Sequence, residues 1–160
     1  MRFLLVLAKL ITARPEHVPA IAEAIRDPDR REIWASSMSK PERVLLSGLR
    51  YSDFVMTGMA DDVPVCMWGV VQESLVGNVG VPWMIGTKHL DALAVTFLRR
   101  CREPLLQVLK RYDRLVNYVD ARNTRTIKWL TFMGFKVDKD PVPYGVFNLP
   151  FHRFSMVKEK

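Results

Sequence analysis

Residues 85–89, with the sequence Ile-Gly-Thr-Lys-His, offer one glycine, one lysine and one histidine, residue types that could hold an anion. They stand just before a helix that the apolar spacing predicts over residues 90–101. The first N–H groups of a helix have no partner inside it, and the helix dipole adds positive charge there. Lys88 and His89 add to that charge, whereas Asp91 opposes it. Anion binding through Thr87, Lys88 and the start of the helix is therefore one interpretation of this segment.

The cysteines and histidines give little support to metal or redox chemistry. Cys66 and Cys101 have no other Cys or His close by in sequence, as a metal site of usual spacing would require. Both fall in apolar segments, and we interpret them as small core residues. His17, His89 and His152 are interpreted as ordinary surface or partly buried residues, and His89 is the best placed of the three for function. The four tryptophans are interpreted as core residues.

The positive charge of the chain is concentrated in one stretch. The formal net charge is +7, and residues 99–136 contain ten Lys or Arg against three acids. A one-sided basic region attracts polyanions such as DNA, an acidic protein, anionic lipid or a phosphate-rich cofactor. A solvated helix surface explains the same charges, and both interpretations stay open.

The spacing of apolar residues predicts helices and strands over the whole chain. Asp29 is expected to be an N-cap, with Glu32 completing a capping box. Pro104 predicts a break or a kink near Glu103, because proline inside a helix costs about 3 kcal/mol. Residues 141–145 are expected to form a loop. We predict strands over residues 3–12, 54–59, 65–71, 81–86, 115–119, 135–137 and 147–157, the last interrupted at Pro150, and helices over residues 15–25, 29–38, 41–49, 90–101, 105–112 and 124–133.

These elements predict a mixed α/β fold in a single domain over residues 1–160, since no linker or repeat divides the chain. The apolar residues 3–8 briefly resemble a secretory signal. Lys9 interrupts them and no cleavage site follows, so that a first strand explains them better. No apolar stretch approaches the length of a membrane span, and we expect none.

One segment and the order of elements resemble the GNAT family of N-acetyltransferases. The family shows a strand, an Asn that opens a helix, and a Gly-Phe pair eleven residues later. Asn123 and Gly134-Phe135 have this spacing here, after the strand predicted over residues 115–119. The resemblance implies a mixed central sheet flanked by helices, with an opening between that strand and the one ending at residue 86. It also implies acetyl-CoA as a cofactor, with contacts from Ile85, Gly86, Thr87, Lys88, His89 and Asn123.

The chain departs from the family at the positions that carry the reaction. Residues 86–91 lack the second glycine of the family's pyrophosphate loop. Leu130 stands where the family commonly has a tyrosine that protonates the departing thiolate. For the base, Glu73 lies just beyond a strand end and Glu32 is explained by its capping box, while Tyr144 on the predicted loop is a remote substitute for the acid. The catalytic residues are therefore left unassigned.

A narrower resemblance is to a GNAT-like family of tailed bacteriophages that includes internal virion protein A. Its supporting segments are residues 29–33, 82–87 and 119–123. This resemblance implies a protein of the virion or the host cytoplasm, with weak or lost acetyltransferase activity. Its partners would be other virion proteins, or DNA or an acidic protein bound by residues 99–136. The alternative is a working acetyl-CoA-dependent N-acetyltransferase acting on an amine of a protein or small molecule.

Overall fold

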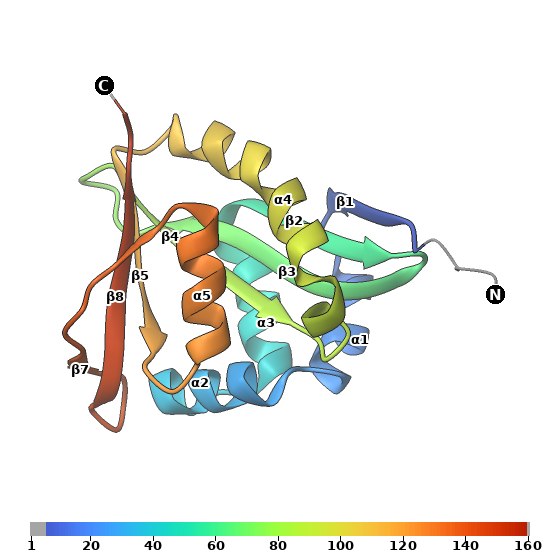
Figure 1. Ribbon diagram of the computed structural model, residues 1–160, viewed down its shortest axis with the longest axis horizontal. Coiled ribbons are helices and arrows are strands. Elements are labelled where there is room, and N and C mark those ends of the chain that lie inside the picture. The colour runs from blue at the N-terminus through green and yellow to red at the C-terminus, as the bar shows by residue number, and fades with distance from the viewer. Residues whose placement is uncertain (1–5, 160) are drawn as a thin grey trace.

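The computed structural model describes residues 6–159, which form an eight-stranded mixed sheet with helices on both faces (Figure 1). The strand order is β1-β2-β3-β4-β5-β8-β6, and β7 pairs with β8 outside this path. The strands are β1 (Ala8–Thr12), β2 (Ser52–Ala60), β3 (Val63–Gln72), β4 (Val79–Gly86), β5 (Arg114–Asp120), β6 (Lys136–Val137), β7 (Val142–Tyr144) and β8 (Leu149–Val157). The helices are η1 (Pro15–His17), α1 (Val18–Glu23), α2 (Asp27–Ser37), α3 (Pro41–Tyr51), α4 (Leu90–Leu109) and α5 (Thr124–Met133). The predicted α/β fold class is confirmed.

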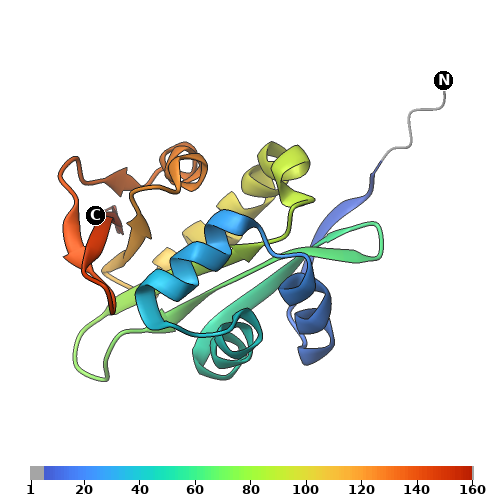
Figure 2. The same ribbon diagram turned by 90° about the horizontal axis from the view of Figure 1, so that it is seen from below.

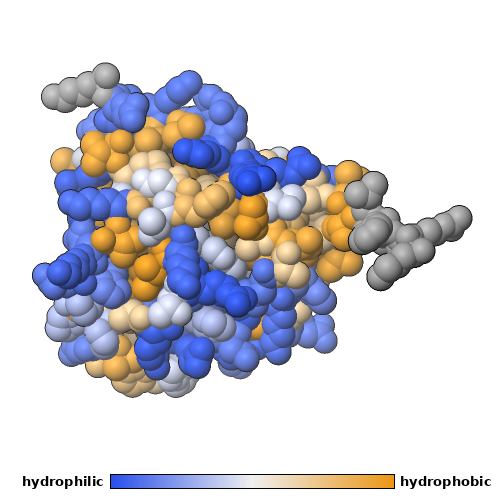
Figure 3. Space-filling view, in the orientation of Figure 1, coloured by the Kyte–Doolittle hydropathy of each residue, from blue (hydrophilic) through white to orange (hydrophobic). Residues whose placement is uncertain are grey.

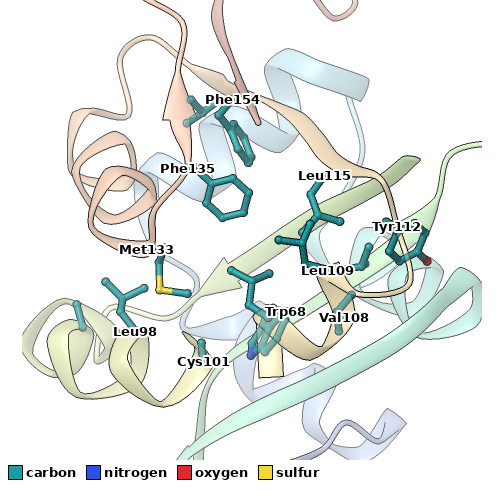
Figure 4. Packing of buried hydrophobic residues seen from close by; sticks show 14 residues of the cluster. Trp68, Leu98, Cys101, Val108, Leu109, Tyr112, Leu115, Met133, Phe135 and Phe154 are labelled. Atoms are coloured by element: carbon teal, nitrogen blue, oxygen red, sulfur yellow. The ribbon is translucent and has the colours of Figure 1, made fainter. Parts of the chain in front are cut away.

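Two apolar layers hold the helices against the sheet. Met67 and Trp68 are neighbours in β3, and their side chains point to opposite faces because side chains alternate along a strand. Met67 packs with apolar residues of α1, α2 and α3, and Trp68 packs with those of α4 and α5. Figure 4 shows the second layer, where side chains from α4, α5, β3, β5 and β8 converge. Cys66 and Cys101 are both buried, as predicted.

The sheet opens between β4 and β5. These strands run parallel and pair only at Val79 with Arg114 and Gly80 with Leu115, at the start of each strand. Beyond that point β4 remains paired with β3 as far as Gly86, and β5 remains paired with β8. The opening implied by the family resemblance is therefore present.

Pro82 and Asn117 lie where the two strands separate. The carbonyl oxygen of Pro82 faces β5, since it accepts a hydrogen bond of 2.7 Å from Asn117 Nδ2. On the same edge proline has no N–H to donate, so a continuous ladder could not form there. Asn117 Oδ1 also accepts the N–H of Tyr118 at 2.8 Å. A single side-chain amide thus replaces the backbone ladder at the point where it ends.

Three predicted boundaries near prolines are wrong. Helix α4 continues through Pro104, because Cys101, Leu105 and Val108 remain on one buried face and pack into the core on both sides of it. Pro150 lies within β8 opposite Pro143, so the last strand is not interrupted there. The predicted loop over residues 141–145 contains β7, which pairs with β8.

The beginning of the chain forms an edge strand. The predicted strand over residues 3–12 is confirmed as β1 from Ala8, and residues 3–5 lie outside the described part of the chain. β1 pairs with β2 in antiparallel register. Among the helices of residues 6–159, none combines the length and the apolar character that crossing a bilayer requires.

Candidate active site

Helix α2 crosses the gap between the diverging ends of β4 and β5, and is seen in blue across the near side of Figure 2. Asp29 Oδ2 accepts the N–H of Gly86, at the end of β4, at 2.8 Å. Glu32 Oε1 accepts the N–H of Asp120, at the end of β5, at 2.6 Å. Residues three apart share a helix face, so one turn of α2 reaches both strands. The two carboxylates satisfy donors that the separated strands no longer satisfy for each other.

The predicted capping box of α2 is wrong. The helix begins at Asp27, and its N-cap is Arg26, so Asp29 lies in the first turn rather than before it. Glu32 is consequently not used to cap its own helix. Its carboxylate reaches the end of β5, a contact between residues 88 apart in sequence.

Glu32 has a strongly perturbed ionisation. Desolvation by burial raises its pKa to about 8, and the nearby charges of Asp29 and Asp120 act in the same direction. The N–H of Asp120 and the charge of Arg26 oppose the shift without cancelling it. At pH 7 Glu32 is therefore mainly protonated, with a pKa suited to proton exchange near neutrality.

A cavity of about 390 Å³ lies at the opening of the sheet, and Glu32 is among its lining residues. Most of its wall is apolar and comes from α4, α5 and the facing strands. The polar groups are few: besides Glu32 they include Asn117, Tyr118 and Tyr144. A largely apolar hollow with a small number of polar groups is the usual form of a small-molecule site. Cys101 also lines the cavity, but burial raises the pKa of its thiol well above the neutral range, so it is no nucleophile.

Tyr144 is held in place at the cavity, although the sequence places it on a loop. Its ring stacks on that of Tyr118 with centroids 4.4 Å apart and lies 4.9 Å from the ring of Phe151. Burial raises the pKa of Tyr144, and the neighbouring Tyr118 and Glu32 raise it further. The phenol therefore keeps its proton through the neutral range and can donate it.

Other sequence candidates lie elsewhere. Leu130 does line the cavity, so an apolar side chain occupies the position of the family's usual acid. Glu73 is exposed beyond the end of β3. His17 is buried with its Nδ1 2.8 Å from Thr57 Oγ1, and His152 Nδ1 lies 2.8 Å from the Asp138 carbonyl oxygen. Neither of these two histidines lines the cavity.

The N–H groups of the predicted anion-binding segment are largely taken by the protein itself. The N–H of Thr87 donates to Val65 O at 2.8 Å, and that of Lys88 donates to Ala24 O at 2.9 Å. The N–H of Gly86 is bound by Asp29, as described above. A Cβ at Gly86 would collide with Leu90, so this glycine serves internal packing. The side chains of Lys88 and His89 remain exposed at the start of α4, whereas Ile85 is buried and lines the cavity.

Arg26, which the sequence did not single out, joins the starts of α4 and α5. Its side chain is only 3% exposed and contacts Asp29 at 2.9 Å and Asp91 at 3.0 Å. Its guanidinium also lies 4.3 Å from the ring centroid of Trp129 on α5. Arg125 binds the same Asp91 carboxylate at 3.1 Å. The carboxylate of Asp91 thus places negative charge from the chain itself in the first turn of α4.

Two buried polar groups near these helix starts lack good partners. Asn123 caps α5, as predicted, because its Oδ1 accepts the N–H of Thr126 at 3.4 Å. Its Nδ2 lies close enough to Asp29 to influence that carboxylate, but forms no hydrogen bond of acceptable geometry. Thr87 Oγ1 is fully buried and also has no hydrogen-bond partner among residues 6–159. Unsatisfied buried polar atoms are uncommon and often mark a functional place.

The chain is similar to solved structures, whereas comparisons of its sequence find no match. No protein-family model matches the sequence, and no curated protein matches it. The chain is similar to a GNAT-family acetyltransferase from Bacillus anthracis, at 9% identity, a TM-score of 0.69, and 96% of each chain covered. It is also similar to spermidine N-acetyltransferase from Vibrio cholerae, solved with CoA and spermine, at 10% identity and a TM-score of 0.67, covering 94% of this chain and 95% of that one.

A third similar structure is yncA from Salmonella typhimurium, solved with acetyl-CoA. The identity is 13% and the TM-score 0.67, with 96% of this chain and 95% of that chain covered. Identities this low establish the fold alone. The mixed sheet and the helices around it therefore match the GNAT acetyltransferase fold.

Proposed function

We propose that the protein transfers an acyl group, acetyl in the simplest case, from coenzyme A to an amine at the cavity between β4 and β5. The observation that carries this proposal is the pair of proton-transfer groups, Glu32 and Tyr144, on the wall of that cavity. The family resemblance assigns the opening of the sheet to the pantetheine arm. Two of the similar structures contain CoA or acetyl-CoA, which supports the same donor here.

Each of the two groups has the ionisation that its role requires. In acyl transfer the amine nitrogen bonds to the thioester carbon, the carbon–sulfur bond breaks, and the sulfur leaves as a thiolate. Glu32, once ionised, takes the proton that the amine loses, and its pKa of about 8 makes it an effective base near neutral pH. Tyr144 keeps its proton and donates it to the thiolate. Tyr144 thus takes the role of the family's tyrosine, whose position Leu130 occupies in this chain.

The cofactor phosphates would lie at the starts of α4 and α5. The exposed Lys88 and His89 side chains supply positive charge there, and the helix N-terminus adds its dipole. Thr87 and Asn123 also lie at these helix starts, but their side chains are buried, so Lys88 and His89 are the groups that can reach a phosphate. Because the backbone N–H groups of Gly86 to Lys88 are taken, side chains rather than the backbone carry this binding.

Calorimetry and a rate measurement test the proposal. Acetyl-CoA should bind with micromolar affinity, and Lys88→Ala should weaken that binding severalfold because it removes a charge at the phosphates. Lys110→Ala, which removes an exposed lysine just beyond α4, should leave affinity unchanged. With an amine acceptor, release of free thiol should accelerate as pH rises towards 8 and then level off. Glu32→Gln should lower kcat and abolish this pH dependence.

A second candidate is a GNAT-fold binding protein without turnover, as in the phage resemblance. The observation that favours it is the occupation of the Gly86 to Lys88 N–H groups and of the α4 start by the chain's own partners. An absence of heat with millimolar acetyl-CoA would select this candidate and refute the first. The association with a virion stays a prediction from the sequence.

A further inference from the structure

A second hollow of about 570 Å³ lies beside α2 and uses different residues of that helix from those at the cavity. Glu32, Ile33 and Ser36 of α2 line the cavity, whereas the second hollow is lined by Arg30, Arg31, Trp34 and Ala35 of the same helix. We call it the basic groove; its lining includes Arg30, Arg31, Trp34, Lys40, Arg122 and Phe147. No acidic side chain of residues 6–159 is among its lining residues.

The cations of the basic groove are poorly compensated. Arg30, Arg31 and Lys40 are exposed and take part in no ion pair within the described part of the chain. Arg122 binds Asp120 at 2.7 Å, yet 55% of its side chain remains exposed. A hollow with several unpaired cations and no acid concentrates positive potential and attracts an anion.

Aromatic rings are exposed in the same groove. The sequence interpretation of Trp34 as a core residue is wrong, since Trp34 is 52% exposed, and Phe147 is 47% exposed. Trp34 follows Arg30 by four residues and Arg31 by three on α2, so the three side chains share one helix face. A tryptophan beside arginines offers a flat surface and charge to the same ligand.

The fold builds this groove through a close contact between α2 and the turn from β7 to β8. Gly145 in that turn has a φ of 74°, and a Cβ there would collide with the carbonyl oxygen of Ala35. Only glycine allows both the left-handed conformation and this approach. Phe147, two residues after Gly145, lines the basic groove together with Trp34 and Ala35 of α2.

We propose that the basic groove binds a nucleotide unit, with its base against Trp34 and its phosphate on Arg30, Arg31 and Lys40. The ring and the anion needed are both present in a nucleotide, and the volume falls in the usual range for small-molecule sites. This site does not depend on the transferase activity proposed above, because the cavity uses other residues.

Titration with adenosine 5′-monophosphate tests the proposal. Trp34→Ala should weaken binding at least about fivefold, as expected for loss of one stacked base. Trp34→Phe should retain most of the affinity, because a ring remains. Leu46→Ala is the matched control, since Leu46 is a similarly exposed apolar residue on α3 outside the groove. It should leave affinity unchanged.

The charge requirement is tested in the same way. Arg31→Ala should weaken binding of the nucleotide, and Arg50→Ala, at an exposed arginine of α3 outside the groove, should not. Ribose 5-phosphate should bind far more weakly than the nucleotide. Equal binding of the two ligands would overturn the proposal, as would a loss with Lys88→Ala but none with Trp34→Ala, which would place the nucleotide at the start of α4.

A single-stranded oligonucleotide distinguishes the source of the nucleotide. Tighter binding of an adenine oligonucleotide than of the mononucleotide, with the same sensitivity to Trp34→Ala and a steep salt dependence, would identify a strand as the ligand. Equal or weaker binding would identify a free nucleotide. Absence of binding by either ligand at millimolar concentration would refute the site.

Discussion

Asp29 and Glu32 are carboxylates one helical turn apart, yet their surroundings give them different roles. Burial raises the pKa of Asp29 too, but the guanidinium of Arg26 and the N–H of Gly86 bind its carboxylate and oppose that rise. Glu32 receives only the N–H of Asp120, because Arg26 directs its side chain to Asp29 and Asp91. Without a paired cation, the desolvated Glu32 carboxyl retains its proton. One acid is therefore structural, and the other is available for proton transfer.

The pKa of Glu32 predicts a pH-dependent stability. Between about pH 4.5 and pH 8 the folded protein holds a proton on Glu32 that the unfolded chain has released, so the free energy of unfolding falls as pH rises. Glu32→Gln lacks this effect but keeps an oxygen for the Asp120 N–H. From pH 5 to 8.5, wild type should lose on the order of a few kcal/mol relative to the variant. Thermal unfolding across this range measures the difference.

Glu42→Gln is the matched control for that measurement. Glu42 is exposed in the first turn of α3, so its replacement should change the free energy of unfolding little and by the same amount at each pH. A difference between wild type and Glu32→Gln that stayed constant with pH would show that Glu32 is not the perturbed acid.

At the scale of elements, packing decides that α4 continues through Pro104. Pro104 removes one backbone donor from the helix interior, so the carbonyl oxygen four residues earlier loses its partner. The buried stripe on both sides of Pro104 nevertheless keeps its spacing of three and four residues, and the core holds it as one helix. Local propensity alone could not reveal this, because the offsetting contacts come from β3, β5 and β8.

Pro104→Ala should therefore stabilise the protein. The variant restores a helical hydrogen bond, and part of the gain is lost because alanine leaves the unfolded chain more freedom. We expect a net gain of about 1–2 kcal/mol, or a rise of several degrees in Tm. Val95→Ala, at an exposed position of the same helix, should change Tm little. A lower Tm for Pro104→Ala would show that the proline is needed for packing.

For the molecule as a whole, the basic stretch over residues 99–136 remains exposed. All ten of its Lys and Arg residues lie at the surface, and of these Arg122 and Arg125 are in ion pairs with Asp120 and Asp91. Figure 3 shows the face that carries α4 and α5, where hydrophilic side chains surround hydrophobic patches. These basic side chains are therefore accessible to a polyanion, and the binding predicted from the sequence stays a prediction.

Duplex DNA at varied salt concentration tests this prediction. The logarithm of the binding constant should fall linearly with the logarithm of salt concentration, because bound cations release counterions. Replacing Arg99 and Arg100 by Glu should weaken binding strongly. The same change at Arg43 and Arg50 of α3 alters the net charge equally and should weaken binding less. Equal effects of the two double variants would indicate a response to net charge alone.

The sequence by itself determined most of the helices and strands, including both ends of helix α5 beside the cavity. Apolar periodicity predicted every strand but β7, and the helices with α4 in two pieces, while Asn123 with Gly134 marked both ends of α5 correctly. These features depend on local hydrogen bonds and on burial of one face, which neighbouring residues encode. The mixed α/β fold followed from their order.

Only the tertiary structure decided which side chains meet at the opening of the sheet. In the sequence, Asp29 and Glu32 fit a local capping box. In the folded protein they instead accept the N–H groups that β4 and β5 leave unpaired where the two strands separate. Tyr144 approaches Glu32 only because β7 joins β8. Such contacts join residues 57 or more positions apart, and their energies depend on burial that exists only once the chain has folded.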